Sequence, residues 1–76
     1  MSNADICRLL SPLYDDPAQF HELSPLLPGM SRSEVREVGE YLNGTGLAEV
    51  KAIEGSVVAR IGVSGRLFVE RERRSQ

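Results

Sequence analysis

Three polar side chains at the start of one amphipathic segment have the chemistry needed to contact a nucleic acid. Arg32, Ser33 and Arg36 lie in or near the first turn of a helix that the sequence predicts over residues 32–43. A guanidinium can bind a phosphate or the edge of a guanine, and helices that enter the major groove make such contacts from their first turns. Helical spacing places Ser33 and Arg36 opposite the apolar stripe, so we expect them to face outward.

Two acidic residues on the same predicted face favour another use of the helix. Glu37 and Glu40 would repel nearby phosphates, although a glutamate can accept a hydrogen bond from cytosine. Arg36 and Glu40, four residues apart, could simply pair on a solvated face, and such a pair contributes about 0.2–0.5 kcal/mol. Arg32 and Glu37 could pair less ideally. This face therefore fits either DNA contact or the docking of another protein.

A predicted β-hairpin supplies two more basic candidates. Lys51 and Arg60 lie on its two strands and could approach phosphates from one side. Its tip, Glu54-Gly55-Ser56, lacks the arginine or lysine that commonly enters a minor groove. The complete set of candidate DNA-binding residues is Arg32, Ser33, Arg36, Lys51 and Arg60.

Hydrophobic spacing and turn residues predict the elements that must position these side chains. Apolar residues recur at helical spacing in four segments, and β-branched residues dominate two later segments separated by Glu54-Gly55, a pair suited to closing a hairpin. The expected class is α+β, with a three-helix core, a two-stranded hairpin and a short C-terminal helix. The predicted helices cover residues 5–14, 17–26, 32–43 and 64–73, and the predicted strands cover residues 48–53 and 56–61.

The third helix has the clearest start and end signals in the chain. Ser31 is the expected N-cap, Glu34 completes a capping box, and Met30 and Val35 occupy the positions of a hydrophobic staple. The stretch "NGTG" at 43–46 contains residues able to adopt the left-handed conformation in which many helices end. We interpret Gly39, in mid-helix, as a position of close packing.

Weaker signals define the second helix. Asp16 is a candidate N-cap, followed by Pro17 at the first helical position and Gln19 as a capping-box partner. Pro25 removes a backbone donor and disfavours helical geometry at Ser24, so the helix should end or kink near its C-terminus.

The closing helix is expected to start at a Ser64 cap, with Leu67 and Phe68 turned toward the core. Its end is the most basic region of the chain. We interpret it as a solvated, fraying tail in which Glu70 and Glu72 offset part of the positive charge. The arginines of this region are Arg66, Arg71, Arg73 and Arg74.

Two stretches resemble the winged helix-turn-helix superfamily, as found in bacterial regulators. "PGMSRSEVREVGEYLNGTGLAEV" is similar to its turn, third helix and first wing strand, and "ARIGVSGRLFVE" is similar to its second wing strand and closing helix. The resemblance covers roughly residues 16–70. It implies one winged-helix domain over residues 1–76 that binds double-stranded DNA as a transcription regulator through the third helix and the wing. Winged helices also serve as protein-docking modules, which is the alternative function.

Composition limits the other classes of function. The chain has 76 residues with a formal net charge of −2, which argues against strong nonspecific nucleic-acid binding without excluding a local basic surface. One cysteine, Cys7, cannot form an internal disulfide, and one histidine adds too few ligands for zinc. No nucleophile–base pair or phosphate-binding glycine loop is recognisable, so we expect neither catalysis nor a cofactor.

Partners and location follow from size and hydropathy. A domain this small has a marginal core, and association with a second copy or with another protein could stabilise it. A homodimer or a complex with another protein partner is therefore possible. The first and closing helices would form such a dimer with Leu10, Tyr14 and Phe68 as surplus apolar side chains. No apolar run could span a bilayer and no basic-then-apolar leader is visible, which predicts a cytoplasmic protein without a membrane partner.

Overall fold

The first helix, α1 (Asn3–Asp15), forms where apolar residues recur three and four positions apart. In the computed structural model, which describes residues 2–75, its buried stripe includes Ile6 and Leu13. Ser2 caps its N-terminus, and Asp5 completes a capping box that was not predicted. The helix predicted over residues 5–14 is therefore confirmed, and it begins earlier because of this cap.

The helix predicted over residues 17–26 does not form, and that prediction is wrong. Turns follow α1, then a two-residue strand, β1 (His21–Glu22), and a short 3-10 helix, η1 (Ser24–Leu26). Asp16 is the C-cap of α1 and not the N-cap of a new helix. The backbone N–H of Leu23 bonds to the carbonyl of Val57 at 3.0 Å. Pairing with the sheet therefore uses a backbone donor that a helix would have needed. Pro25 has no backbone N–H, so a second donor is missing from this segment.

The third predicted helix is α2 (Arg32–Thr45), and its start is confirmed. The N–H of Glu34 donates to the Ser31 hydroxyl at 3.2 Å, and the Glu34 carboxylate accepts from the Ser31 N–H at 3.0 Å. The helix continues to Thr45 and ends at Gly46, whose φ of 76° is left-handed. Glycine adopts this conformation without steric penalty, so the chain can turn directly into the next strand.

The two predicted strands form with the expected bounds as β2 (Ala48–Ile53) and β3 (Ser56–Ile61). They join β1 in an antiparallel sheet with the order β1-β3-β2. Glu54 and Gly55 close the hairpin with positive φ angles of 49° and 83°. A Cβ on Gly39 would lie 3.2 Å from methyl groups of both Val50 and Val57. The interpretation of Gly39 as a close-packing position is thus confirmed, with the sheet as the neighbour of α2.

The closing helix, α3 (Val63–Arg74), begins one residue before its predicted start, and Gly62 is its N-cap. The prediction of Ser64 as the cap is therefore wrong, because Ser64 lies inside the first turn of the helix. Gly65 and Val69, four residues apart, face the core, so Leu67 points away from it and is 54% exposed. The expectation that Leu67 turns inward is wrong, whereas Phe68 packs partly buried against the core.

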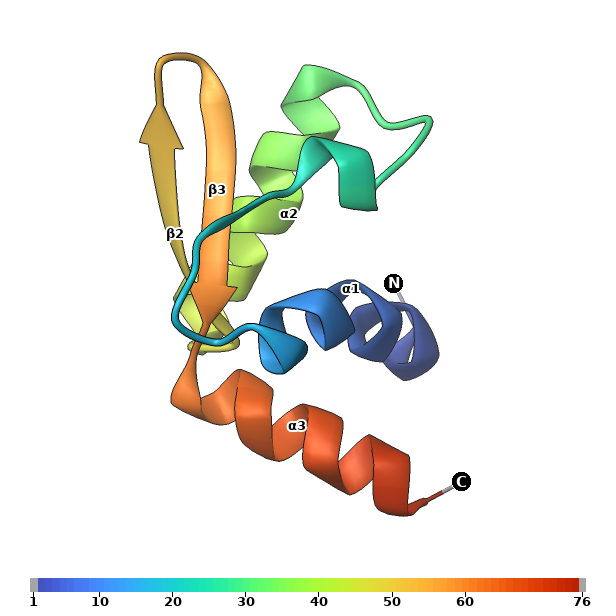
Figure 1. Cartoon of the computed structure of the whole chain (residues 1–76). Helices are drawn as coiled ribbons and strands as arrows, with labels where there is room; N and C mark the ends of the chain where they lie inside the picture. The colour runs from blue at the N-terminus through green and yellow to red at the C-terminus, as the bar shows by residue number, and fades with distance from the viewer. Residues whose placement is uncertain (1, 76) are drawn as a thin grey trace.

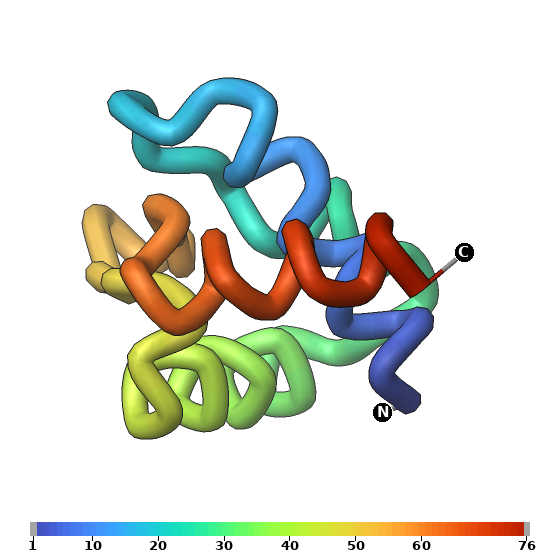
Figure 2. The backbone as a smooth tube through the Cα atoms, turned by 90° about the horizontal axis from the view of Figure 1, so that it is seen from below, coloured from blue at the N-terminus to red at the C-terminus, as the bar shows by residue number. Residues whose placement is uncertain are grey.

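One core joins the sheet to all three helices. In Figure 1, α2 lies alongside the hairpin, and α1 lies between α2 and α3; Figure 2 shows the same helices from below. Leu10 is 0% exposed, so its expected role as a surplus dimer contact is wrong. Within residues 2–75, no helix is long and apolar enough to cross a membrane. The fully buried large side chains are Leu10, Leu13, Leu23, Leu42 and Val69.

Candidate nucleic-acid interface

A groove between α2 and the hairpin brings three of the five predicted DNA-binding residues together. Arg32 and Arg36 line it from α2, and Lys51 lines it from β2; its volume is about 300 Å³. Residues four positions apart lie on the same side of a helix, which explains why both arginines face the hairpin. The remaining lining residues are Gly39, Glu40, Asn43, Val50, Ala52, Gly55 and Val57.

The packing of α2 on the hairpin sets the shape of this groove. Close approach at Gly39 brings the helix onto β2 and β3. At the far end, the Asn43 side-chain carbonyl lies 3.4 Å from the N–H of Val50, an outward-facing group of the edge strand β2. The helix and the edge strand therefore hold the walls of the groove at fixed positions.

The N-terminus of α2 and the hairpin turn lie at the same end of the molecule (Figure 1). Arg32 lines a second hollow there, of about 240 Å³, together with Glu22, Ser24 and Ser56. A ligand bound at this end would meet Arg32, the turn at Glu54 and the exposed first turn of α2 together.

The pairing of Arg36 with Glu40 and of Arg32 with Glu37, which the sequence permits, does not occur. Over residues 2–75, neither arginine makes an ion pair or a side-chain hydrogen bond, and both are exposed. Their guanidinium groups are thus available to an anionic ligand.

The acidic residues of α2 are divided between two sides of the helix. Glu40 lines the hairpin groove beside Arg36. Glu37 lines a different groove, of about 360 Å³, between α1 and α2. Of the two glutamates that argue against DNA contact, only Glu40 shares a groove with the arginines.

Glu34 lies on the same side of α2 as Glu37 and lines the α1–α2 groove. The Ser31 backbone N–H donates to its carboxylate and the Ser31 hydroxyl contacts the same residue, so the pKa of Glu34 is lowered. Glu34 is therefore charged at neutral pH.

Arg60 does not join the groove. It forms an ion pair with Glu49 at 2.6 Å, and its guanidinium lies 4.7 Å from the centre of the Phe20 ring. Glu49 is its partner across the two strands. Val50, the residue after Glu49, faces α2 at Gly39, and successive side chains of a strand point to opposite faces of the sheet. Arg60 and Glu49 consequently lie on the sheet face opposite α2.

Phe20 was not among the residues predicted for this surface, because it lies within residues 17–26, where the sequence predicts a helix that does not form. Its ring is also 4.7 Å from the Lys51 ammonium. The two cations stack on one aromatic ring, an arrangement worth about 0.5–1 kcal/mol each at exposed sites. Lys51 therefore lies between the groove and the outer face of the sheet.

Ser33 is exposed on α2 but is not part of the groove lining. It lies one residue after Arg32, and successive residues of a helix point in different directions. A ligand confined to the groove would not reach it, whereas a ligand covering the whole first turn of α2 would.

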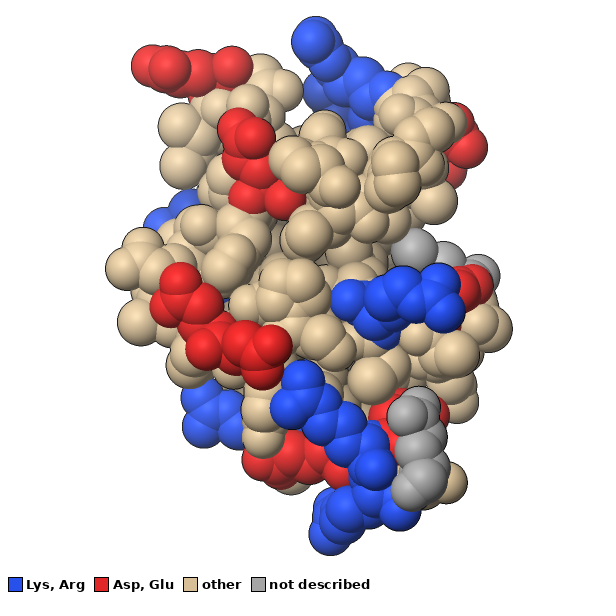
Figure 3. All heavy atoms as spheres, turned by 45° about the vertical axis from the view of Figure 1, so that its right-hand side comes forward, with Lys and Arg blue, Asp and Glu red and all other residues tan. Residues whose placement is uncertain are grey.

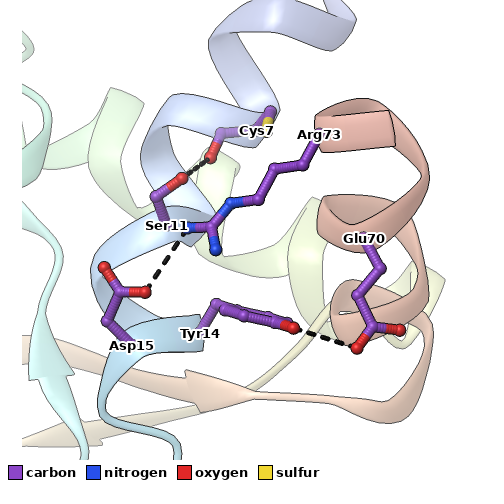
Figure 4. Close-up of polar contacts among 6 residues, drawn as sticks. All are labelled: Cys7, Ser11, Tyr14, Asp15, Glu70 and Arg73. Carbon is purple, nitrogen blue, oxygen red and sulfur yellow. Dashed lines mark hydrogen bonds and ion pairs between the residues drawn. The ribbon is translucent and has the colours of Figure 1, made fainter. Parts of the chain in front are cut away.

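The arginine-rich end of α3 is part of the fold, contrary to the prediction of a fraying tail. The Tyr14 hydroxyl donates to Glu70 at 2.9 Å, and Arg73 lies over the Tyr14 ring and 3.4 Å from the Asp15 carboxylate (Figure 4). The hydrogen bond to the Glu70 carboxylate is the main cause that raises the pKa of Tyr14. Figure 3 shows basic side chains, with acidic ones beside them, at the lower end of the molecule, where α3 lies.

The remaining side chains with possible chemistry are the metal-ligand types and the single thiol. No group of three or more His, Cys, Asp or Glu side chains in residues 2–75 could hold a metal ion. Cys7 is buried, and its carbonyl accepts the Ser11 hydroxyl at 2.7 Å. Comparison with protein-family models, with curated proteins and with solved structures gives no match.

Proposed function

We propose that this chain is a small winged helix-turn-helix protein that binds double-stranded DNA and regulates transcription. The observation that carries the proposal is the groove beside the hairpin in which Arg32 and Arg36 lie without an ion pair to any residue from 2 to 75. The helix would lie in the major groove, and the hairpin would act as the wing beside it. A cytoplasmic location belongs to the same proposal.

The order of the elements supports the winged-helix interpretation. A helix, a short strand, a helical turn, a second helix and a hairpin follow one another before the closing helix. In this arrangement η1 would take the place of the second helix of the core, and α2 would be the helix that contacts DNA. The short η1 is the departure from the expected three-helix core.

Within this proposal the basic residues have different roles. Arg32 and Arg36 contact bases or phosphates, and Lys51 contacts the backbone from the adjoining strand. Arg60 contributes from the outer face of the sheet after release from its ion pair with Glu49. Ser33 extends the contact along the first turn of α2.

The test is fluorescence anisotropy with a labelled random duplex, first at about 50 mM salt, where phosphate contacts are strong. The double variant Arg32→Ala/Arg36→Ala should weaken binding at least about tenfold. The slope of log K against log salt concentration should become less negative by about 1.8, because each of the two lost phosphate contacts contributes about 0.9 to it. The control is Arg8→Ala/Arg66→Ala, which removes the same charge from exposed positions on α1 and α3. Absence of binding at low salt, or an equal loss in the control, would reject the proposal.

A second candidate function is a protein-interaction module that does not bind DNA. One observation favours it: the α1–α2 groove exposes Met30 and Tyr41, which are 37% and 50% exposed, beside Glu34 and Glu37. Apolar surface with an acidic border suits a protein partner better than a phosphate backbone.

A further inference from the structure

The outward face of α3 combines apolar and basic side chains that have no role in the core. Val63 is 80% exposed and Leu67 is 54% exposed. Residues four and seven positions after Leu67 lie on the same face of the helix, and these are Arg71 and Arg74. The opposite face of α3, with Gly65 and Val69, is the one that packs on the core. This outward face is therefore apolar at its start and basic toward its end.

The α1–α2 groove has the complementary composition. Its apolar lining comes from both helices and from the loop before α2, and its charged lining is acidic. Because the groove is open to solvent, an inserted side chain would bury apolar surface that the monomer leaves exposed. The lining residues are Ile6, Met30, Val38 and Tyr41, with Glu34 and Glu37.

We propose that this groove receives the outward face of α3 from a second copy of the chain. Leu67 is the apolar anchor, and Arg71 lies beside Glu37 of the second molecule. The two surfaces of one chain are complementary: the outward face of α3 is basic and apolar, the α1–α2 groove is acidic and apolar, and both are open to solvent in the monomer. Two α3 faces would instead bring like charges together.

A chain cannot fill its own groove with α3. One face of α3 packs toward α1, and its Leu67 face points away from the core. In Figure 1, α1 lies between α3 and α2. The contact is therefore head-to-tail, with different surfaces on the two molecules, and such contacts produce rings or open chains rather than closed two-fold dimers.

The association is weak and depends on salt. A helix of 12 residues is about 18 Å long, so the contact lies below the roughly 1,200 Å² of a standard stable interface. Its ion pairs are exposed and are screened at high ionic strength. We expect association at high micromolar protein concentration that decreases as salt rises.

Sedimentation equilibrium tests the proposal on the full chain. At about 500 µM protein and about 50 mM salt, the average mass of the wild type should exceed that of the monomer and should fall toward it at about 500 mM salt. Glu37→Arg and Arg71→Glu should each weaken association at least about tenfold, since each places like charges at the contact. Circular dichroism should show unchanged folding, because both residues are exposed.

Mixing the two variants identifies the geometry. Glu37→Arg keeps an intact α3 face and Arg71→Glu keeps an intact groove, so an equimolar mixture should associate again, through the native charge pair at one contact and the exchanged pair at the next. The double variant Glu37→Arg/Arg71→Glu should recover association through the exchanged charges. A wild type that stays monomeric at low salt would overturn the proposal, as would a mixture that stays monomeric. A Leu67→Glu variant that dissociates while Glu37→Arg does not would assign the contact to paired α3 helices instead.

Discussion

The hydroxyl of Tyr14 donates a hydrogen bond of 2.9 Å to the carboxylate of Glu70, which joins α1 to α3 across 56 positions of the sequence. Arg73 lies over the same ring, 4.7 Å from its centre, and reaches Asp15 on the far side (Figure 4). One aromatic side chain of α1 thus contacts two successive turns of α3. The charged end of the chain is held by this contact.

The Tyr14–Glu70 hydrogen bond should be visible in a titration. Because the neutral hydroxyl donates to a carboxylate, the pKa of Tyr14 is raised above its ordinary value of 10.0. Because the pKa is raised in the folded state, this bond stabilises the fold fully when the pH is below the pKa of the unfolded state. The stabilisation is lost as the pH rises through the pKa of the folded state. Ultraviolet titration in a Tyr41→Phe background, which leaves Tyr14 as the one tyrosine, should show the raised value. Glu70→Gln should move it back toward 10.0; no movement would contradict this cause.

Gly65 allows α3 to contact the backbone of Leu47, the residue before β2. A Cβ at this position would lie 2.0 Å from the carbonyl oxygen of Leu47, and a backbone atom cannot move aside as a side-chain end can. We expect Gly65→Ala to lower the free energy of unfolding by about 2–3 kcal/mol, the scale of overpacking. Gly44→Ala is the control, since nothing lies within 4 Å of its Cβ position, and it should raise stability by about 0.5–1 kcal/mol. Urea unfolding measures both, and equal effects would contradict the contact.

The parts of the fold that the sequence predicted correctly depend on local signals. The start of α2 follows from Ser31 and Glu34, which bond to each other's backbone within one turn. The hairpin follows from Glu54 and Gly55, which adopt positive φ between two β-branched segments. Neither feature needs information about distant residues.

The errors arise where distant contacts decide the structure. Residues 17–26 contain helix-start signals, but the N–H of Leu23 bonds to Val57, 34 positions away, and this pairing was not visible in local spacing. Leu67 was expected inside because it is apolar, whereas Gly65 and Val69 occupy the inner face of α3. A glycine used for close approach carries no hydrophobic signal.

The candidate site was predictable for α2 and less so for the hairpin. Arg32 and Arg36 are one helical turn apart, so their common side follows from the sequence. Whether Lys51 and Arg60 join them depends on strand register and on Phe20, whose position follows from β1. The separation of Glu37 from Glu40 depends on where α1 and the hairpin pack around α2.

The capping box of α2 should make stability sensitive to acid. Hydrogen bonding by Ser31 lowers the pKa of Glu34 below its ordinary value of 4.5. A lowered folded-state pKa contributes stability above the unfolded-state pKa, and this contribution is lost as pH falls through the folded-state pKa. Glu34→Gln should therefore reduce the difference in thermal midpoint between neutral pH and acidic pH. Glu37→Gln, one turn along the same helix, is the control. An equal loss of pH dependence in both variants would assign the effect to net charge.

The hairpin turn contains a residue that is poorly suited to its backbone. Glu54 has a φ of 49° and carries a side chain that disfavours this region, whereas asparagine is favoured at the first position of a two-residue hairpin turn. We expect Glu54→Asn to raise the free energy of unfolding by roughly 0.5–1 kcal/mol, a part of the penalty for left-handed geometry. Chemical unfolding checks this, with Glu54→Gln as the control that removes the charge without easing the backbone. A similar gain in both would show that charge, and not backbone geometry, is the cause.

Glu40 and Glu37 offer a matched test of which side of α2 meets DNA. Both are exposed glutamates of one helix, but Glu40 lines the groove with Arg36, whereas Glu37 lines the groove facing α1. If phosphates approach from the hairpin side, Glu40→Gln removes a repulsive charge next to them and should tighten duplex binding about three- to tenfold at low salt. Glu37→Gln should give a smaller gain, because Glu37 lies farther from the phosphates and its repulsion is screened with distance. Fluorescence anisotropy at nanomolar protein concentration, where self-association is negligible, measures the two affinities under the same conditions. A larger gain from Glu37→Gln would place the DNA on the α1 side of the helix and would remove Lys51 from the contact.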